Sequence, residues 1–298
     1  MTREIKNIPY LGCGIGLRAE IAEKTLAHKN EIDVLEIVAE QFFPNSRPRS
    51  IPFLQKFSSQ FPIIPHGVKL SIGSAAPLEK DFFGGMKELS AMLNASFYSD
   101  HFALTRLGED LDTGHLSPLW FTKEMLEHVV RRVDETQQAL GVPLVLENIT
   151  AEIKIQEADF EEPEFITEVC RRTGCGLLLD VTNININACN HREDPFALAE
   201  RYPMDSVVYI HLAGGEIHHG AFKDTHSQEL IGPNEKVWEL LEWVLKRADI
   251  KALIIERDQN FKEDFELMVL QDLRKARAIV EAGKPANRQA GKTRVSSA

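Results

Sequence analysis

The sequence predicts a (β/α)8 TIM barrel, an α/β fold in which eight parallel strands are surrounded by helices. Short β-rich runs alternate with longer segments of helical periodicity along nearly the whole chain, and eight such units can be counted. The length of 298 residues suits this fold, because one barrel domain commonly uses about 250 residues. We therefore expect a single barrel domain over residues 1–283.

The eight expected strands are short, mostly apolar runs, as parallel strands buried on both faces should be. In chain order they cover residues 11–15, 34–38, 63–65, 97–99, 144–146, 176–179, 207–210 and 252–255. Gly12, Gly14 and Gly16 follow the start of the first strand, without the further glycine that a dinucleotide-binding fingerprint requires. We expect these glycines to allow close backbone approach at the barrel mouth.

Amphipathic segments between the strands predict the outer helices. The clearest covers residues 122–140 and ends before Gly141, a residue suited to the left-handed conformation that terminates helices. Its apolar face comprises Met125, Leu126, Val129, Val130, Val133 and Leu140. Two later helices are marked by Trp238, Leu240, Leu241, Val244 and Leu245, and by Phe265, Leu267, Val269, Leu270 and Leu273. Residues 284–298 lack apolar periodicity, so we expect a disordered tail there.

Composition and charge disfavour several classes of partner. The net charge of −11 opposes attraction to polyanions, so we expect no nucleic-acid partner. No apolar run approaches the roughly 20 residues that span a bilayer, and the charged N-terminus lacks the apolar core of a secretory signal. We therefore expect a cytoplasmic protein with no membrane partner. Four cysteines without a CxxC pair or zinc-finger spacing indicate reduced thiols.

Six successive expected strands, from the third to the eighth, each end at a residue that can bind a metal. These residues are His66, His101, Glu147, Asp180, His211 and Glu256, and the loop after the seventh strand adds Asp224 and His226. In a closed barrel the carboxyl ends of all strands converge on one mouth, where active sites of this fold are built. Several carboxylates brought together are unfavourable unless cations neutralise them. The pattern therefore predicts a metal cluster, and imidazole with carboxylate favours iron, zinc or manganese.

A single strand-terminal His or Asp has an ordinary structural explanation, as a helix cap or a hydrogen-bonded loop residue. Asp100 precedes His101, and either an orienting or proton-accepting carboxylate or a structural cap fits its position. We expect Arg257 and Asp258 to orient metal ligands from behind. The histidines expected to be structural or at the surface are His28, His115, His128 and His191.

In order, these ligands resemble the trinuclear site of endonuclease IV and the wider xylose-isomerase-like barrels, except that Asn183 stands where the endonuclease has histidine. The short sequence motifs around these ligands more closely resemble those of the multinuclear non-heme iron-dependent oxidases, a family that includes the catalytic subunit of methanobactin biosynthesis. In that family, asparagine is the expected residue at position 183. This resemblance covers about residues 8 to 280. Its motifs are His66-Gly67-Val68, Ser99-Asp100-His101, Leu146-Glu147-Asn148, Asp180-Val181-Thr182-Asn183, His211-Leu212-Ala213-Gly214-Gly215 and Asp224-Thr225-His226-Ser227.

The resemblance implies an enzyme that uses O2 to oxidise a residue, often cysteine, in a ribosomally synthesised precursor peptide, usually with a partner protein that delivers the peptide. It implies two or three iron ions as Fe2+ and Fe3+, although zinc or manganese stays open from ligand type alone. Glu147 would bridge two irons. The first would also be held by His66 and His101, the second by Asp180, His211 and Glu256, and a third, weaker position by Asn183, Asp224 and His226.

Three alternatives stay open from the sequence. A phosphodiesterase like endonuclease IV would use divalent zinc to bind a phosphate, but the net acidity and the lack of basic clusters near the strand ends disfavour it. A sugar isomerase or epimerase would need proton- or hydride-shuttling groups rather than so many histidines. A noncatalytic metal-binding scaffold in a biosynthetic complex would keep its partner binding after Glu147→Gln.

Overall fold

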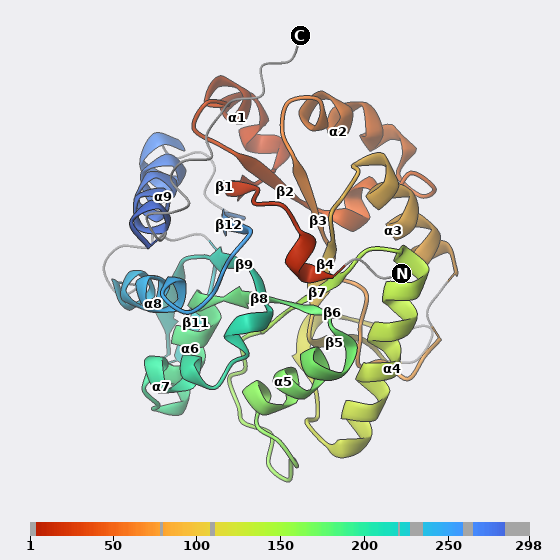
Figure 1. Ribbon diagram of the computed structural model, residues 1–298, viewed down its shortest axis with the longest axis vertical. Coiled ribbons are helices and arrows are strands. Elements are labelled where there is room, and N and C mark those ends of the chain that lie inside the picture. Colours follow the sequence, from red (N-terminus) through yellow and green to blue (C-terminus); the bar gives the residue numbers. More distant parts are fainter. Residues whose placement is uncertain are drawn as a thin grey trace.

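The computed structural model describes residues 4–77, 80–107, 111–219, 221–226, 235–258 and 265–283. Eight parallel strands form a closed barrel in the order β1-β12-β9-β8-β7-β4-β3-β2 (Figure 1). Their bounds are Gly12–Gly16 (β1), Val34–Val38 (β2), Ile63–His66 (β3), Tyr98–His101 (β4), Leu144–Glu147 (β7), Gly176–Asp180 (β8), Val207–Leu212 (β9) and Ala252–Ile255 (β12). The predicted (β/α)8 barrel is therefore confirmed.

Each predicted strand is present, but six of them end one or two residues later than the sequence suggests. The strands β3, β4, β7, β8 and β9 all continue through a polar residue at their carboxyl end. His101 pairs in register with Glu147, and Asp180 pairs with His211. The reason is that ladder pairing uses backbone groups, so a strand continues where the apolar pattern stops.

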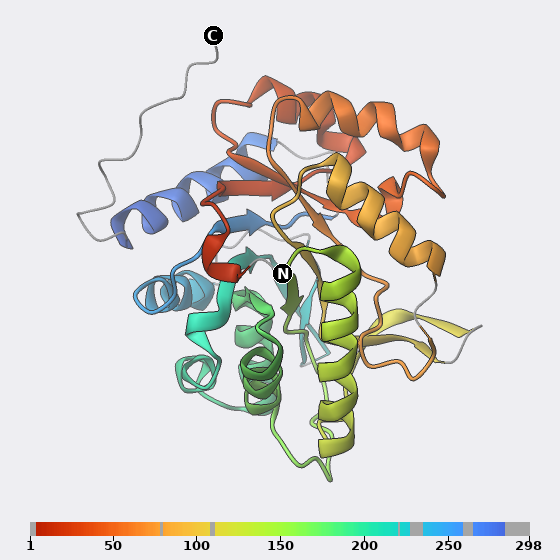
Figure 2. The ribbon, with the colours of Figure 1, turned by 45° about the vertical axis from the view of Figure 1, so that its right-hand side comes forward.

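Helices surround the barrel on its outer face (Figures 1 and 2). They are Ala22–Ala27 (α1), Ile51–Ser58 (α2), Lys80–Met92 (α3), Lys123–Leu140 (α4), Glu162–Thr173 (α5), Val181–His191 (α6), Pro195–Glu200 (α7), Glu235–Leu245 (α8) and Gln271–Gly283 (α9). Short 3-10 helices cover Ile5–Asn7, Ala19–Ile21, Ala39–Phe42, Pro48–Ser50 and Met204–Ser206. Helix α4 begins after Thr122, whose side chain accepts the Met125 N–H, and ends at Gly141 with φ 72°, as predicted. The last helical stretch opens with the π-helix Glu266–Leu270.

Two antiparallel hairpins at the carboxyl end of the barrel were not predicted. Ala103–Leu107 (β5) pairs with Leu111–Pro118 (β6) after β4, and Gly215–His218 (β10) pairs with Ala221–Asp224 (β11) after β9. The first hairpin projects at the right of Figure 2, in yellow. Strand β6 is largely exposed and mostly polar, so it lacks the apolar alternation that marks a half-buried strand.

The core has two parts. The barrel interior is filled by a layer that includes Val34, Ile64, Val145 and Ile254, and a larger cluster fills the space between the sheet and the helices. Gly14 permits close packing of β1 on β2, because a Cβ there would lie 1.8 Å from the carbonyl oxygen of Val34. This close approach was expected at the mouth, but Gly14 pairs with Val34, the first residue of β2, so the contact lies at the amino-terminal end of that strand.

Two further expectations from the sequence concern membrane-spanning helices and the C-terminal residues 284–298. In the described residues, no helix combines the length and apolarity needed to cross a bilayer. The predicted tail, residues 284–298, lies outside the described residues.

Candidate metal centre

Six strand ends bring metal-binding side chains into one buried group at the barrel mouth. Each of these side chains belongs to a residue that is at most 6% exposed. They are His66 from β3, His101 from β4, Glu147 from β7, Asp180 from β8, His211 from β9 and Glu256 directly after β12. The convergence follows from barrel closure, since parallel strands end on the same face.

The group divides into two overlapping sets. In each set, the possible ligand atoms lie within 4.8 Å of one another. The first set is His66, His101 and Glu147, and the second is Glu147, Asp180, His211 and Glu256. Glu147 belongs to both.

The two carboxylate oxygens of Glu147 face different histidines. Oε2 lies 3.4 Å from His66 Nε2 and 3.2 Å from His101 Nε2. Oε1 lies 3.5 Å from His211 Nδ1, which is itself 3.2 Å from Glu256 Oε2. A carboxylate in this position can give one oxygen to each of two cations.

A further set lies beside the second one, at the edge nearer solvent. His226 Nε2 contacts the Asp224 carboxylate and lies 3.5 Å from Glu256 Oε2. Asn183 follows β8, where its backbone N–H donates to Asp180 and its side-chain amide donates to the carbonyl oxygen of Asn148. The remaining amide oxygen, Asn183 Oδ1, is buried without a hydrogen-bond partner. Asn183, Asp224 and His226 all line the mouth cavity of about 240 Å³.

Four buried polar atoms of this group have no hydrogen-bond partner: Glu147 Oε2, Asp180 Oδ2, Asn183 Oδ1 and His211 Nδ1. Leaving a buried acceptor unpaired costs about 1–3 kcal/mol. Cations would satisfy these acceptors together, and the mixture of imidazole and carboxylate donors suits divalent transition metals. The residues present therefore fit a multinuclear metal site.

Ionisable groups in the site strongly shift one another's pKa. Burial, together with the negative charges of Glu147 and Asp224, raises the pKa of Asp180 well above its usual range. Burial also disfavours the charged form of Glu147, but the positive charges of His101 and His211 outweigh it and lower the Glu147 pKa. Burial lowers the His101 pKa, yet Glu147 and Asp100 raise it overall to about 10. Protons and cations therefore compete for the same atoms, and metal binding should release protons.

The second ring nitrogen of each candidate histidine ligand has an acceptor. This arrangement fixes the ring and its tautomer. The acceptors are Ser99 Oγ for His66 (2.9 Å), the Gly67 carbonyl oxygen for His101 (3.1 Å), Glu36 Oε2 for His211 (2.9 Å) and Asp258 Oδ2 for His226 (3.2 Å).

Of the residues expected to orient ligands, Asp258 contacts a candidate ligand and Arg257 contacts the outer helix α9. Asp258 accepts from His226 and also from Arg18 across the mouth. Arg257 donates to Asp272 of α9 at 3.3 Å. Consecutive residues point to opposite sides of an extended chain, which accounts for the difference.

Asp100 is not brought into the group. Its carboxylate accepts the backbone N–H groups of Leu70 and His101, at 3.1 and 2.8 Å. On β4 the side chains of Ser99 and His101 face the barrel interior, so the intervening Asp100 faces the opposite side. Asp100 Oδ1 also lies 3.8 Å from His101 Nδ1, so the geometry is compatible with a carboxylate that orients His101 and with a structural residue that fixes the loop after β3.

Glu36 is a site residue that the sequence reasoning missed. It is 3% exposed on β2, and its Oε2 accepts from His211 and from the hydroxyl of Tyr209 at 3.0 Å. The available signal was a single carboxylate inside the apolar run Val34–Val38, since a buried charge needs a partner.

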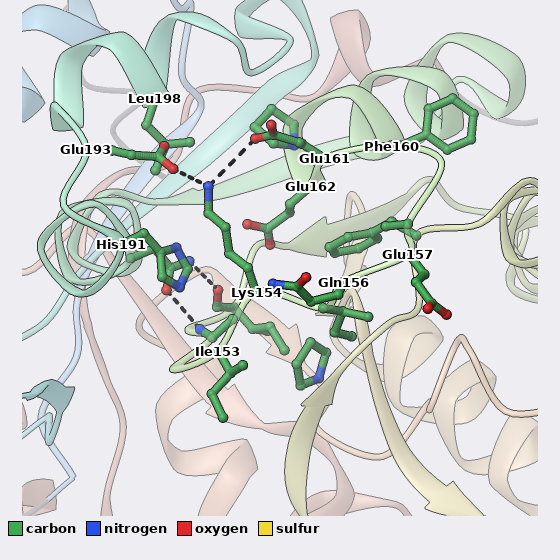
Figure 3. Close-up of a pocket in the computed structure, with 18 of the residues that line it drawn as sticks. Ile153, Lys154, Gln156, Glu157, Phe160, Glu161, Glu162, His191, Glu193 and Leu198 are labelled. Carbon is green, nitrogen blue, oxygen red and sulfur yellow. Dashed lines mark hydrogen bonds and ion pairs between the residues drawn. The ribbon is translucent and has the colours of Figure 1, made fainter.

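Histidines expected to be structural lie elsewhere. His28 contacts Glu31, and His128 Nε2 lies 2.9 Å from the carbonyl oxygen of Ser74. His115 is exposed on β6. His191 lines a separate cavity of about 410 Å³ beneath the loop after β7, shown in Figure 3, where Lys154 forms ion pairs with Glu161 and Glu193.

Comparison with known proteins identifies a family by sequence and a fold by structure. Residues 12–281 match the family model described as RiPP precursor modification enzyme MbnB/TglH/ChrH. A UPF0276 protein of Anaeromyxobacter sp. (strain Fw109-5) is 36% identical over 282 residues, which cover 94% of this chain and 96% of that protein. A UPF0276 protein of Rhizorhabdus wittichii is 34% identical and covers 84% of this chain and 87% of its own.

Two similar solved structures share the fold at low sequence identity. Endonuclease IV from Thermus thermophilus has a TM-score of 0.56 and 17% identity, covering 92% of this chain and 100% of that chain. D-Psicose 3-epimerase from Clostridium cellulolyticum has a TM-score of 0.54 and 14% identity, covering 91% and 97%. At such identities the likeness shows the fold alone.

Proposed function

This chain belongs to the RiPP precursor modification enzyme family MbnB/TglH/ChrH, and from that membership we propose that it is a multinuclear non-heme iron-dependent oxidase. Its substrate would be a ribosomally synthesised precursor peptide, and O2 would be the co-substrate that oxidises one residue, cysteine in our proposal. A partner protein would deliver the peptide to the barrel mouth.

The placement of Glu147 between two ligand sets supports a site for more than one ion. Its two oxygens face His66 and His101 on one side and His211 on the other. A single ion cannot use all nine candidate residues, which are the six strand-end residues and Asn183, Asp224 and His226, because transition metals take four to six ligands. The unpaired acceptor atoms of both sets point to the same conclusion.

We assign each residue a role in that site. Glu147 would bridge the two positions, His66 and His101 would complete one of them, and Asp180, His211 and Glu256 would complete the other. Asn183, Asp224 and His226 form a third position, which should be the weakest because a neutral amide is a poorer ligand than imidazole. When bound, iron supplies O2 activation and acidifies a coordinated substrate thiol.

The mouth cavity gives this site a restricted entrance. Its walls include the apolar side chains of Val38, Val68, Leu116 and Ile149, beside the ligands. A cavity of about 240 Å³ admits a peptide side chain, and apolar walls limit the access of water to the reacting group. Arg18 lies at the same mouth and is held by Asp258. Asp100, in this proposal, acts indirectly by fixing the loop that carries the Gly67 partner of His101.

The rival functions receive less support. The net charge of −11 disfavours a nucleic-acid substrate, and Asn183 differs from the endonuclease IV pattern. The epimerases share only the fold at 14% identity.

The decisive experiment is metal analysis with turnover. Protein purified without oxygen should contain two or three irons per chain and consume O2 when given a cysteine-containing peptide encoded near its gene. The peptide should change mass by an oxidative modification only when both iron and O2 are present. Protein that contains zinc alone, and that iron cannot activate, would favour the hydrolase alternative instead.

A further inference from the structure

A chain of buried hydrogen bonds runs beneath the candidate metal centre and joins its two ligand sets. His66 Nδ1 lies 2.9 Å from Ser99 Oγ, and Ser99 Oγ lies 2.6 Å from the hydroxyl of Tyr209. That hydroxyl donates to Glu36 Oε2 at 3.0 Å, and the same oxygen lies 2.9 Å from His211 Nε2. All five side chains belong to residues at most 5% exposed, so water does not compete for these bonds.

The donors and acceptors in this chain allow one consistent direction when both histidines bind a cation. His66 must then carry its hydrogen on Nδ1 and donate to Ser99, which leaves Nε2 free to face Glu147. Ser99 donates in turn to Tyr209, and Tyr209 donates to Glu36. His211 donates from Nε2 to the same carboxylate, so its Nδ1 lone pair faces the second ligand set.

The alternative direction leaves an unfavourable contact. If Ser99 donated to the Pro65 carbonyl oxygen at 3.4 Å and Tyr209 donated to Ser99, the Tyr209 oxygen would face the Glu36 carboxylate at 3.0 Å without a hydrogen between them. Two oxygen atoms at that distance with no proton repel each other. The chain therefore ends at Glu36, which accepts from both directions.

We infer that Glu36, Tyr209 and Ser99 form one positioning network that sets the tautomers of His66 and His211 and couples the two metal positions. The inference rests on the metal centre of the proposed function but not on its reaction. Glu36 is the residue on which the network depends, because it is the only member that accepts without donating. Its negative charge also makes His211 a stronger donor to a cation.

Glu36→Gln tests the charge at the end of the network, and Tyr209→Phe interrupts its middle while keeping the ring. The molecule supplies a matched control, since the Tyr202 hydroxyl donates to Glu162 at 2.9 Å, away from the centre. Glu162→Gln and Tyr202→Phe make the same chemical changes there. Each variant is loaded anaerobically with 57Fe2+, its affinity is measured by chelator competition, and its Mössbauer spectrum is recorded.

We expect Glu36→Gln to weaken iron binding about 10- to 100-fold, the usual loss when a partner behind a ligand is removed. Alone, the Glu36→Gln substitution should change the Mössbauer signals of both irons. When it is combined with Tyr209→Phe, it should change the signal of only one iron. The two control variants should keep wild-type affinity and spectra. Thermal unfolding of the metal-free proteins is recorded for all four variants, to show that each variant still folds.

Wild-type affinity and an unchanged spectrum in Glu36→Gln would overturn the inference. A change of both irons that persists in the Tyr209→Phe background would also overturn the coupling. Binding of Zn2+ or Mn2+ in place of iron by the wild-type protein would contradict the proposed oxidase. The network would still be supported if Glu36→Gln lowered the affinity for those ions by a similar factor.

Discussion

Replacement of Glu147 by Gln tests the bridge on which the proposed site depends. The amide keeps the size of the side chain but removes its charge. In the wild-type structure the carboxylate oxygens lie 3.2–3.5 Å from imidazole nitrogens of both ligand sets. A cation bound between these atoms would lie no farther from the carboxylate than that separation, at which a pair of unit charges is worth about 5 kcal/mol at an effective dielectric constant of about 20.

Part of this energy is offset, because a neutral amide has a smaller desolvation penalty than a buried carboxylate. We therefore expect a net loss of about 3 kcal/mol, which corresponds to roughly 100-fold weaker binding of the bridged ions. The ions would also repel each other across a neutral group. Oxidation of the peptide should be abolished together with the loss of metal.

The fold should survive this substitution, since the barrel is stabilised mainly by its apolar layers. The assays are iron content after anaerobic loading, chelator competition, circular dichroism and O2-dependent peptide oxidation. Glu152→Gln is a suitable control, because Glu152 is an exposed residue of the loop after β7 that pairs with Lys223 at the surface. Wild-type iron content and turnover in Glu147→Gln would refute the bridging role, and retained partner binding without any turnover in the wild-type protein would favour a scaffold.

Three further predictions follow from other positions. His211→Ala should remove at least one ion and His191→Ala none, as measured by metal analysis; equal losses would mean that the site is misplaced. Asn183→Ala should lose at most the third ion and keep the other two, and loss of all metal would contradict the ranking of positions. Burial raises the pKa of Glu162 to about 7 despite the hydrogen bond from Tyr202. This folded-state pKa lies above the unfolded value. The contribution of protonated Glu162 to the stability of the fold is therefore fully present below about pH 4.5 and is lost as the pH rises through 7. Denaturant unfolding of the metal-free proteins measures this effect. Between pH 4.5 and 8, the free energy of unfolding of Glu162→Gln should rise relative to wild type by on the order of 2 kcal/mol. A difference in unfolding free energy that does not change with pH would contradict the raised pKa.

Much of the site could be predicted from the sequence because barrel geometry makes strand ends equivalent. The apolar runs fix where strands lie, and in a closed parallel barrel their carboxyl ends meet. A ligand-type residue after such a run, such as His66 or Glu256, is therefore directed to the mouth whatever its distance along the chain. The residues of the first and second ligand sets follow from this rule, whereas their division into two sets that share Glu147 was implied by the family resemblance.

The sequence did not reveal which side chains at a strand end face inward. Asp100 and His101 are adjacent, yet only His101 reaches the site, since the alternation of β4 depends on where the strand begins in the pleat. The two hairpins were also missed, because β6 and β10 are largely exposed and show no run of buried apolar residues.

The network beneath the metals depends on contacts between distant parts of the chain. Glu36 and Tyr209 lie 173 positions apart, and Ser99 and Tyr209 lie 110 apart, so no local pattern links them. Periodicity and composition act locally along the chain, and they were therefore sufficient to predict the barrel and the types of ligand at its mouth. Which polar groups pair inside the barrel depends on strand register and on closure, and these bring distant residues within hydrogen-bonding distance only when the whole sheet has formed.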